Sequence, residues 1–204
     1  MRTRQPTLLP CLALLFMPAF LVAASEVPEV VETCTECHGT DGMGHGKPLI
    51  PVIAGMPAGH IEEAIYAYVD EARHCVHEPR MCETVAALSE NEVIEVAEYF
   101  AAQHRGPLQE EFDEVLAAKG EKLHRRHCAA CHLSPDDPEV EYSLGIPLNG
   151  QRREYLRYAI EAYLKGDREA LLQAMAHELR ELEAGDLGAL VDYYSSYRSL
   201  TMLP

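Results

Sequence analysis

The sequence predicts an all-α protein in which two small helical domains follow one another along the chain. Three observations lead to this prediction. A five-residue motif occurs twice, other residues recur at the spacing of the two copies, and the remaining segments have helical patterns with almost no strand-like alternation. The 204 residues suffice for two domains, each near the lower size at which a chain supports its own apolar core.

The repeated motif is Cys-x-x-Cys-His, present at residues 34–38 and again at residues 128–132. Two cysteines about one helical turn apart can each bond to a vinyl group of haem, and the adjacent histidine then reaches the iron. The expected attachment residues of two haem c groups are Cys34, Cys37, Cys128 and Cys131, and the expected iron ligands are His38 and His132. Redox disulfides or half-sites for zinc are alternative uses of the cysteines, but neither requires the histidine in both copies.

The motif spacing of 94 residues also relates other parts of the chain. Pairs with this spacing are Leu88 and Leu182, Tyr99 and Tyr193, and Phe100 and Tyr194; with one inserted residue, Gly55 corresponds to Gly150 and Tyr68 to Tyr163. The chain therefore reads as a duplication, and features that a haem requires should occur in both copies.

A second axial ligand for each iron must come from outside the motif. Met81 and Met175 are separated by the motif spacing, so they are the pair expected if both irons have histidine and methionine ligands. Both could instead be core methionines at equivalent helix positions. Met56 is a rival ligand in the first half, because it follows His38 at a plausible distance.

The first 24 residues have the pattern of a secretory signal peptide. Arg2 and Arg4 precede an apolar stretch that ends in small residues, so cleavage is expected before Ser25. Two prolines interrupt the short apolar stretch and argue against a retained anchor, so no stable membrane span is expected after cleavage. We therefore expect a periplasmic protein with a first domain at residues 25–105 and a second at residues 106–204.

Two cysteines of the mature chain, Cys75 and Cys82, lie outside both motifs. On one continuous helix they would be roughly 10 Å apart, too far for a disulfide. A turn at Pro79 would bring them together. A disulfide, two free buried thiols, or a thiolate ligand to iron all remain open from the sequence.

The mature chain is strongly acidic, with 15 basic and 33 acidic side chains, which argues against nucleic-acid binding. Residues 25–100 carry 3 basic and 15 acidic side chains, whereas residues 101–204 carry 12 and 18. The negative first half could attract a basic partner, or it could serve only as a solubilising surface.

Residue composition and spacing predict five helices, at residues 61–73, 93–103, 110–127, 152–164 and 187–197. Ser89 and Glu92 form a capping-box pattern before the second of them. Segments 39–57 and 133–150 are rich in glycine and proline and are expected to be loops along a haem edge. His124 and His127 are expected on the surface of a helix.

With these residues in place, the chain resembles a tandem dihaem class I cytochrome c over nearly its whole mature length. The resemblance implies a small all-helical domain around each covalent haem and iron ligation by the motif histidine and a downstream methionine. The second half is similar in particular to the cytochrome subunit of flavocytochrome c sulfide dehydrogenase. The matching stretches are residues 120–124, 148–151, 155–159 and 179–182, together with Met175.

This resemblance implies a periplasmic electron-transfer subunit that accepts electrons from a sulfide-oxidising flavoprotein and passes them to a small redox carrier or an oxidase. The chain would have no sulfide-oxidising site of its own. A freestanding dihaem carrier accounts for the motifs equally well. A dihaem peroxidase or a haem–thiolate sulfur oxidase fits less well, because these need an open sixth position or Cys75 or Cys82 on the iron.

Overall fold

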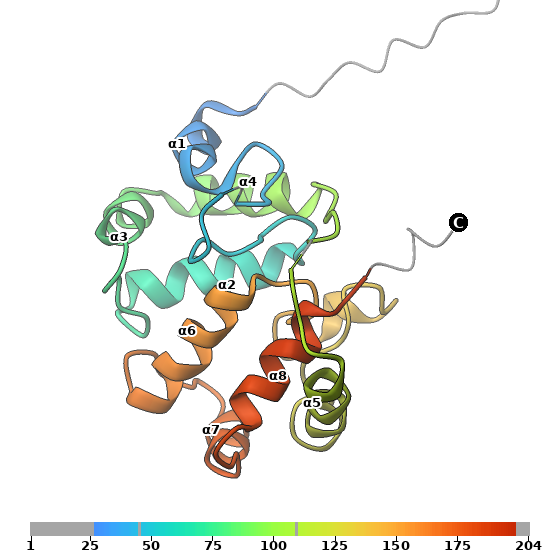
Figure 1. The fold of residues 1–204 in the computed structure, drawn as a ribbon. Helices are drawn as coiled ribbons and strands as arrows, with labels where there is room; N and C mark the ends of the chain where they lie inside the picture. Colours follow the sequence, from blue (N-terminus) through green and yellow to red (C-terminus); the bar gives the residue numbers. More distant parts are fainter. Residues whose placement is uncertain (1–26, 45, 109, 199–204) are drawn as a thin grey trace, which may run out of the picture.

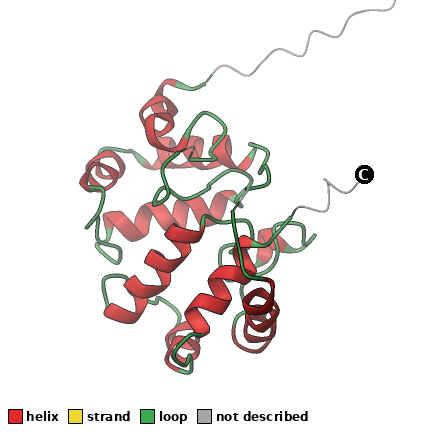
Figure 2. Cartoon of the chain, in the orientation of Figure 1, coloured by secondary structure: helices red, strands yellow, loops and turns green. Residues whose placement is uncertain are grey.

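The computed structural model describes residues 27–198 except 45 and 109, and these residues form eight α-helices and one short 3₁₀ helix (Figures 1 and 2). The first half contains α1 (Glu29–His38), α2 (Ala58–Val69), α3 (Pro79–Ala86) and α4 (Glu90–Ala101). The second half contains α5 (Glu114–His127), the 3₁₀ helix η1 (Val140–Tyr142), α6 (Arg153–Lys165), α7 (Gln173–Arg180) and α8 (Asp186–Ser195). No strand forms in the described part of the chain, which agrees with the all-α prediction. The predicted signal peptide lies outside the described residues.

The helices pack in the same order in both halves. In the first half, α1 and α2 each pack against α4, and in the second half α5 and α6 each pack against α8. Figure 1 shows α1–α4 in the upper part of the molecule and α5–α8 in the lower part. The predicted duplication is therefore a duplication of packing as well as of sequence.

Backbone hydrogen bonds establish the register of the repeat. The amide of Gly55 donates to the carbonyl of Phe100 at 3.0 Å, and the amide of Gly150 donates to the carbonyl of Tyr194 at 3.0 Å. Both glycines have positive φ, 59° and 74°, a backbone conformation that favours glycine. The spacing is thus 95 residues between these loops and 94 between the final helices, as the inserted residue predicted.

The helix bounds differ from the prediction where side chains or tertiary contacts decide them. Helix α5 begins at Glu114 rather than residue 110, because the Asp113 carboxylate accepts hydrogen bonds from the amides of Val115 and Leu116. The predicted capping box of Ser89 is present at the start of α4. The residue pattern did not predict α3 and α7, the short helices that carry the candidate methionines.

The two halves meet about an approximate two-fold axis, because corresponding residues contact each other across the interface. The amide of Glu169 donates to the carbonyl of Ala72 at 2.8 Å, and the amide of His74 donates to the carbonyl of Asp167 at 3.4 Å. Positions 72 and 74 correspond to 167 and 169, so each contact is the counterpart of the other. This pairing explains why α2 ends at Val69 instead of continuing to residue 73.

The connection between the halves is fixed at the same interface by Arg105. Its Nε donates to the carbonyl of Ala54 and its Nη1 to the carbonyl of Asn149, each at 3.0 Å. These carbonyls occupy corresponding positions of the repeat. The guanidinium is buried, and burial lowers the pKa of Arg105 to about 10. The short connection therefore holds equivalent loops of the two halves together.

Candidate haem-binding sites

The first Cys-x-x-Cys-His motif forms the last turns of α1. Cys34 and Cys37 are half-buried free thiols, and His38 ends the helix as a buried side chain. The Nδ1 atom of His38 lies 3.3 Å from the carbonyl oxygen of Pro51, which can only accept a hydrogen bond. Burial lowers the pKa of His38 to about 4, so the imidazole is neutral at pH 7. With its proton on Nδ1, the ring keeps a free Nε2 lone pair for a metal ion.

The second motif reproduces this arrangement after α5. The Nδ1 atom of His132 lies 2.8 Å from the carbonyl oxygen of Ile146, which corresponds to Pro51 at the spacing of 95 residues. Burial lowers the pKa of His132 as well. A Cβ atom at Gly145 would lie 2.5 Å from His132 Cε1, so only glycine lets the ring pack against this backbone. Both motif histidines therefore present the same tautomer.

A cavity of about 620 Å³ lies beside the first motif. Its wall is largely apolar. It includes the motif residues Cys34, Cys37 and His38 and, later in the chain, Met56 and Met81. The volume is within the usual range for cofactor pockets. The residues present fit a haem: two thiols for attachment, a neutral imidazole, thioethers, and an apolar enclosure.

The structure brings both candidate methionine ligands of the first half to this cavity, but only one has a methionine counterpart. Met81 is the third residue of α3 and Met175 is the third residue of α7. Met56 is buried in the first-half core, and its counterpart at the spacing of 95 residues is Gln151. The side-chain amide of Gln151 accepts a hydrogen bond from the backbone N–H of Val52 at 2.7 Å and donates one to the carbonyl of Val52 at 2.8 Å. Equivalent positions on equivalent helices therefore favour Met81 over Met56.

Cys75 and Cys82 form a disulfide with a Cα–Cα distance of 6.0 Å. Of the three alternatives left open by the sequence, two free thiols and a thiolate on iron are therefore wrong. Pro79 occupies the first turn of α3, so the chain turns between the cysteines instead of forming one long helix.

Two arginines from opposite halves line the cavity, Arg168 as a buried side chain and Arg73 as a half-buried one. The Nη2 atom of Arg73 donates to Tyr163 at 3.4 Å, and that of Arg168 donates to Tyr68 at 3.5 Å. These two contacts are exchanged by the two-fold axis, because Arg73 corresponds to Arg168 and Tyr68 to Tyr163. Among the described residues no carboxylate forms an ion pair with either arginine, and Arg168 Nε is buried without a hydrogen-bond partner. Sequence reasoning missed this cluster, although the repeat spacing relates its members.

The placement of His124 differs from the prediction. Its ring is buried between α5 and α8, and Nδ1 lies 3.1 Å from the hydroxyl of Tyr194. Helix α5 turns this face to α8, so the expectation of a surface residue was wrong. His127 is half-buried and bonds Glu178 of α7 at 2.7 Å, which ties the helix of Met175 to the residue before the second motif.

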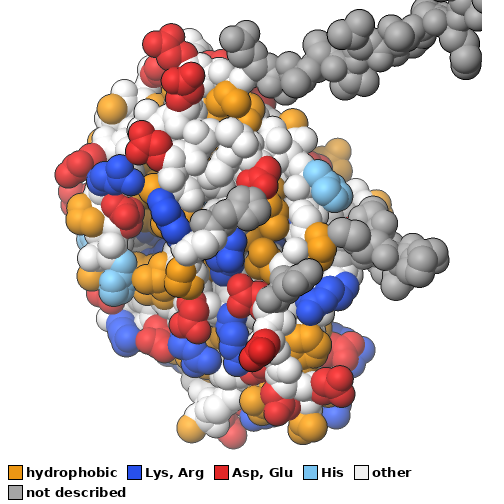
Figure 3. All heavy atoms as spheres, turned by 45° about the horizontal axis from the view of Figure 1, so that its top comes forward, with side chains coloured by type: hydrophobic (Ala, Val, Ile, Leu, Met, Phe, Trp, Pro, Cys, Tyr) orange, Lys and Arg blue, Asp and Glu red, His pale blue; other side chains and the backbone are white. Residues whose placement is uncertain are grey.

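One face of the molecule does not carry an uninterrupted acidic field. The face in Figure 3 has acidic and basic side chains next to each other, with apolar side chains between them. Among residues 27–198, no helix combines the length and apolar character that a membrane span requires.

Comparison with known proteins identifies the family. No protein-family model matches the chain. Cytochrome c-554(548) of Halomonas halodenitrificans is 34% identical over 73 residues, which are 36% of this chain and 87% of that protein. Cytochrome c4 of Thiocapsa roseopersicina is 25% identical over 138 residues, 64% of this chain and 68% of that protein.

Solved structures share the fold. Cytochrome c4 of Acidithiobacillus ferrooxidans matches with a TM-score of 0.68 at 22% identity, covering 82% of this chain and 99% of that one. Thiosulfate dehydrogenase (TsdBA) of Marichromatium purpuratum matches with a TM-score of 0.63 at 23% identity, covering 83% of this chain and 37% of that one. The chain therefore belongs to the class I c-type cytochromes, with two such domains in tandem and two covalently bound haem c groups.

Proposed function

We propose that this dihaem electron carrier is a freestanding periplasmic protein whose two haems relay electrons between a donor and an acceptor. The observation that supports it is the two-fold arrangement of equivalent sites across one interface. A one-electron relay needs two centres held at a fixed separation, and the paired contacts of residues 72–74 with 167–169 fix the halves in that way.

In this proposal Cys34 and Cys37 attach one haem and Cys128 and Cys131 the other. The iron ligands are His38 with Met81 and His132 with Met175. When bound, each haem supplies a one-electron iron couple, and methionine ligation raises its potential. The carbonyls of Pro51 and Ile146 hold the two imidazoles with Nε2 free, at 3.3 and 2.8 Å from Nδ1.

The buried Arg168 and the half-buried Arg73 have a part in the same proposal. Arg73 and Arg168 remain protonated and lie in a cavity wall without carboxylate partners among the described residues. A buried positive charge is costly unless an anion compensates it. The acidic propionate groups of haem would provide that compensation at the interface between the halves.

The ligand assignment is tested by spectroscopy of the ferric protein. The weak charge-transfer band near the red end of the spectrum reports iron–methionine bonds. Met81→Ala and Met175→Ala should each remove the part of the band's intensity that comes from one iron. If Met81→Ala leaves the band unchanged while Met56→Ala weakens it, the first-half ligand is Met56.

The freestanding role is tested by purification from the native host under mild conditions. We expect a cytochrome without flavin that fractionates with periplasmic proteins and exchanges electrons with small carriers. Stable association with another redox protein would overturn the freestanding part of the proposal and leave the haem assignment intact.

The second candidate is the predicted electron-accepting subunit of a sulfide-oxidising flavoprotein. Its support is the second-half resemblance, together with the occurrence of the same fold within a protein named thiosulfate dehydrogenase. Co-purification of a flavoprotein, and reduction of the haems by sulfide only in its presence, would favour this role. If neither occurs, the freestanding carrier stands.

A further inference from the structure

We propose that the Cys75–Cys82 disulfide is a positioning device that holds Met81 at the iron of the first haem. The inference rests on the proposed ligation by Met81. The disulfide closes a loop of residues 76–81, and Met81 is the last residue inside it. Cys75 and Met81 both lie in the wall of the first cavity.

The closed loop is anchored at both ends and in its middle. At the α3 end, α3 packs against α2 and Val85 is buried in the first-half core. At the other end, the amide of His74, the neighbour of Cys75, bonds the carbonyl of Asp167 across the interface. In the middle, the rings of His77 and of Tyr158 on α6 meet edge to face, with centroids 4.9 Å apart.

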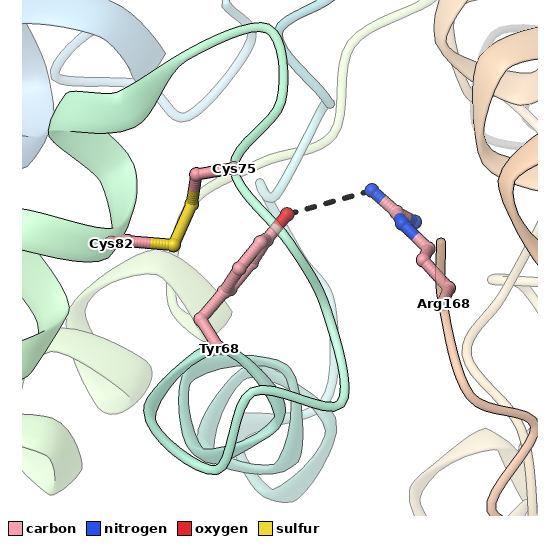
Figure 4. The surroundings of a disulfide bond; sticks show 4 residues. All are labelled: Tyr68, Cys75, Cys82 and Arg168. Carbon is pink, nitrogen blue, oxygen red and sulfur yellow. Dashed lines mark hydrogen bonds between the residues drawn. A yellow bond between two sulfur atoms is a disulfide. The ribbon is translucent and has the colours of Figure 1, made fainter. Parts of the chain in front are cut away.

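Figure 4 shows how the disulfide relates to the interface. It lies beside Tyr68, whose hydroxyl points to Arg168 of the second half. The cross-link therefore joins the methionine helix to the wall in which the two halves meet. Movement of Met81 away from the cavity would require this wall to move as well.

The second half lacks the device. At the spacings of the repeat, the counterparts of Cys75 and Cys82 are Ala170 and Ala176. Helix α7 has no buried residue, and its Glu178 carboxylate accepts a hydrogen bond from His127, which ties it to α5. The two methionines thus occupy equivalent positions on helices with very different restraint.

Restraint matters because a methionine that leaves the iron competes with other ligands for the vacant position. A closed loop limits how far the thioether can move and so raises its effective concentration at the iron. Without the cross-link, α3 can move away and an external ligand binds more readily. We therefore expect the first haem to resist external ligands because of the disulfide.

The test is imidazole binding to the ferric dihaem protein, followed by optical titration. Cys75→Ala/Cys82→Ala gives the first half the residues of the second, and should raise the imidazole affinity of the first haem about tenfold. The affinity of the second haem should not change. Met81→Ala and Met175→Ala assign the two sets of spectral changes. An affinity of the first haem within about twofold of wild type would overturn the inference.

A matched control separates positioning from general loosening. Val93→Ala removes apolar volume from the first-half core at a 2% exposed position of α4 that does not line the cavity. It should lower stability and leave imidazole binding unchanged. If it raises the affinity as much as the double cysteine variant does, the disulfide has no specific role. Cys75→Ser/Cys82→Ser replaces the alanine variant if the latter does not fold.

Failure of the ligand assignment is distinguishable from failure of this inference. If Met81→Ala leaves the iron–methionine band intact, Met81 is not the ligand, so the ligand assignment and this inference both fall while the carrier role does not. If Met81→Ala removes its share but the double cysteine variant binds imidazole as wild type does, only the positioning role falls.

Discussion

The two halves of this cytochrome share one fold but use different interactions to hold it. Among the described residues, the larger apolar cluster of the first half has nine buried side chains and the apolar cluster of the second half has four. The first half adds a disulfide, whereas the second adds buried or half-buried ion pairs. The clearest of these is Asp192, 1% exposed, which accepts hydrogen bonds from Arg153 at 2.6 and 3.0 Å and from the amide of Asp113 at 2.8 Å.

This difference teaches that a repeat preserves its backbone contacts while its stabilising interactions diverge. The counterpart of Asp192 is Glu98, and the counterpart of Arg153 is Ala58, so the ion pair has no equivalent in the first half. We therefore expect the first half to respond to reduction of its disulfide, and the second to respond to pH and salt. Four predictions test this comparison.

The largest effect is expected from Gly120→Ala, at the crossing of α5 and α8. A Cβ atom there would lie 2.0 Å from the carbonyl oxygen of Ala189. This oxygen belongs to the backbone, so it cannot move aside without a large energetic cost. We expect a loss of about 3 kcal/mol or more in unfolding free energy, measured by urea denaturation. Gly188→Ala is the control, because a Cβ atom at that helical position meets nothing within 4 Å. It should stabilise α8 by up to about 1 kcal/mol.

Removal of the disulfide should have the next largest effect, confined to the first half. Cys75→Ala/Cys82→Ala opens a loop between cysteines separated by 7 positions, worth about 2.5 kcal/mol in the chain-entropy treatment. Denaturation followed by haem absorbance should show the loss in the first-half transition. A dithiol reductant should reproduce it in the wild type and have no further effect on the variant. Equal destabilisation of both halves would contradict the comparison.

Asp192→Asn should destabilise the second half by about 2 kcal/mol, because it leaves Arg153 without its charged partner. Burial acts to raise the pKa of Asp192, but the hydrogen bonds from Arg153 and from the amide of Asp113, together with the charges of Arg153 and Arg157, outweigh it and the pKa is lowered. A lowered folded-state pKa stabilises the fold above the unfolded-state pKa, about 4. That stability is lost as pH falls through the folded-state pKa. Stability measured between pH 7 and 2 should therefore fall less steeply in the variant than in the wild type.

The smallest effect is expected from Lys119→Met, which removes the ion pair with Asp186 at 2.7 Å. Lys119 is half exposed, so the loss should be about 0.5 kcal/mol at low salt and should vanish at high salt. Lys122→Met on the same helix is the control, because no ion pair of Lys122 occurs in the described structure. An equal, salt-independent loss in both variants would show that charge pairing is not responsible.

Much of the site could be predicted from the sequence because its constraints are local. The spacing of Cys34, Cys37 and His38 follows from one helical turn, and a copy of the motif gave the register of the repeat. That register selected Met81 and Met175, which occupy the same position on α3 and α7.

The parts that could not be predicted depend on long-range contacts. Helices α3 and α7 have eight residues each, too few for a strong periodic signal. The polar ring of His124 suggested a surface position, whereas the packing of α5 against α8 buries it beside Tyr194. Cys75 and Cys82 could not be paired by spacing alone, since the pairing depends on how the chain turns before α3.

The sequence by itself determined the composition of this protein: two covalent haem motifs, two equivalent all-helical domains and one pair of corresponding methionines. Only the tertiary structure decided how these parts are held. The two-fold interface, the exchanged contacts of Arg73 and Arg168, and the cross-link beside Met81 join residues far apart in the repeat or around a turn. The physical reason is that local spacing fixes covalent chemistry and helix geometry, whereas burial and partner choice exist only after the chain has packed.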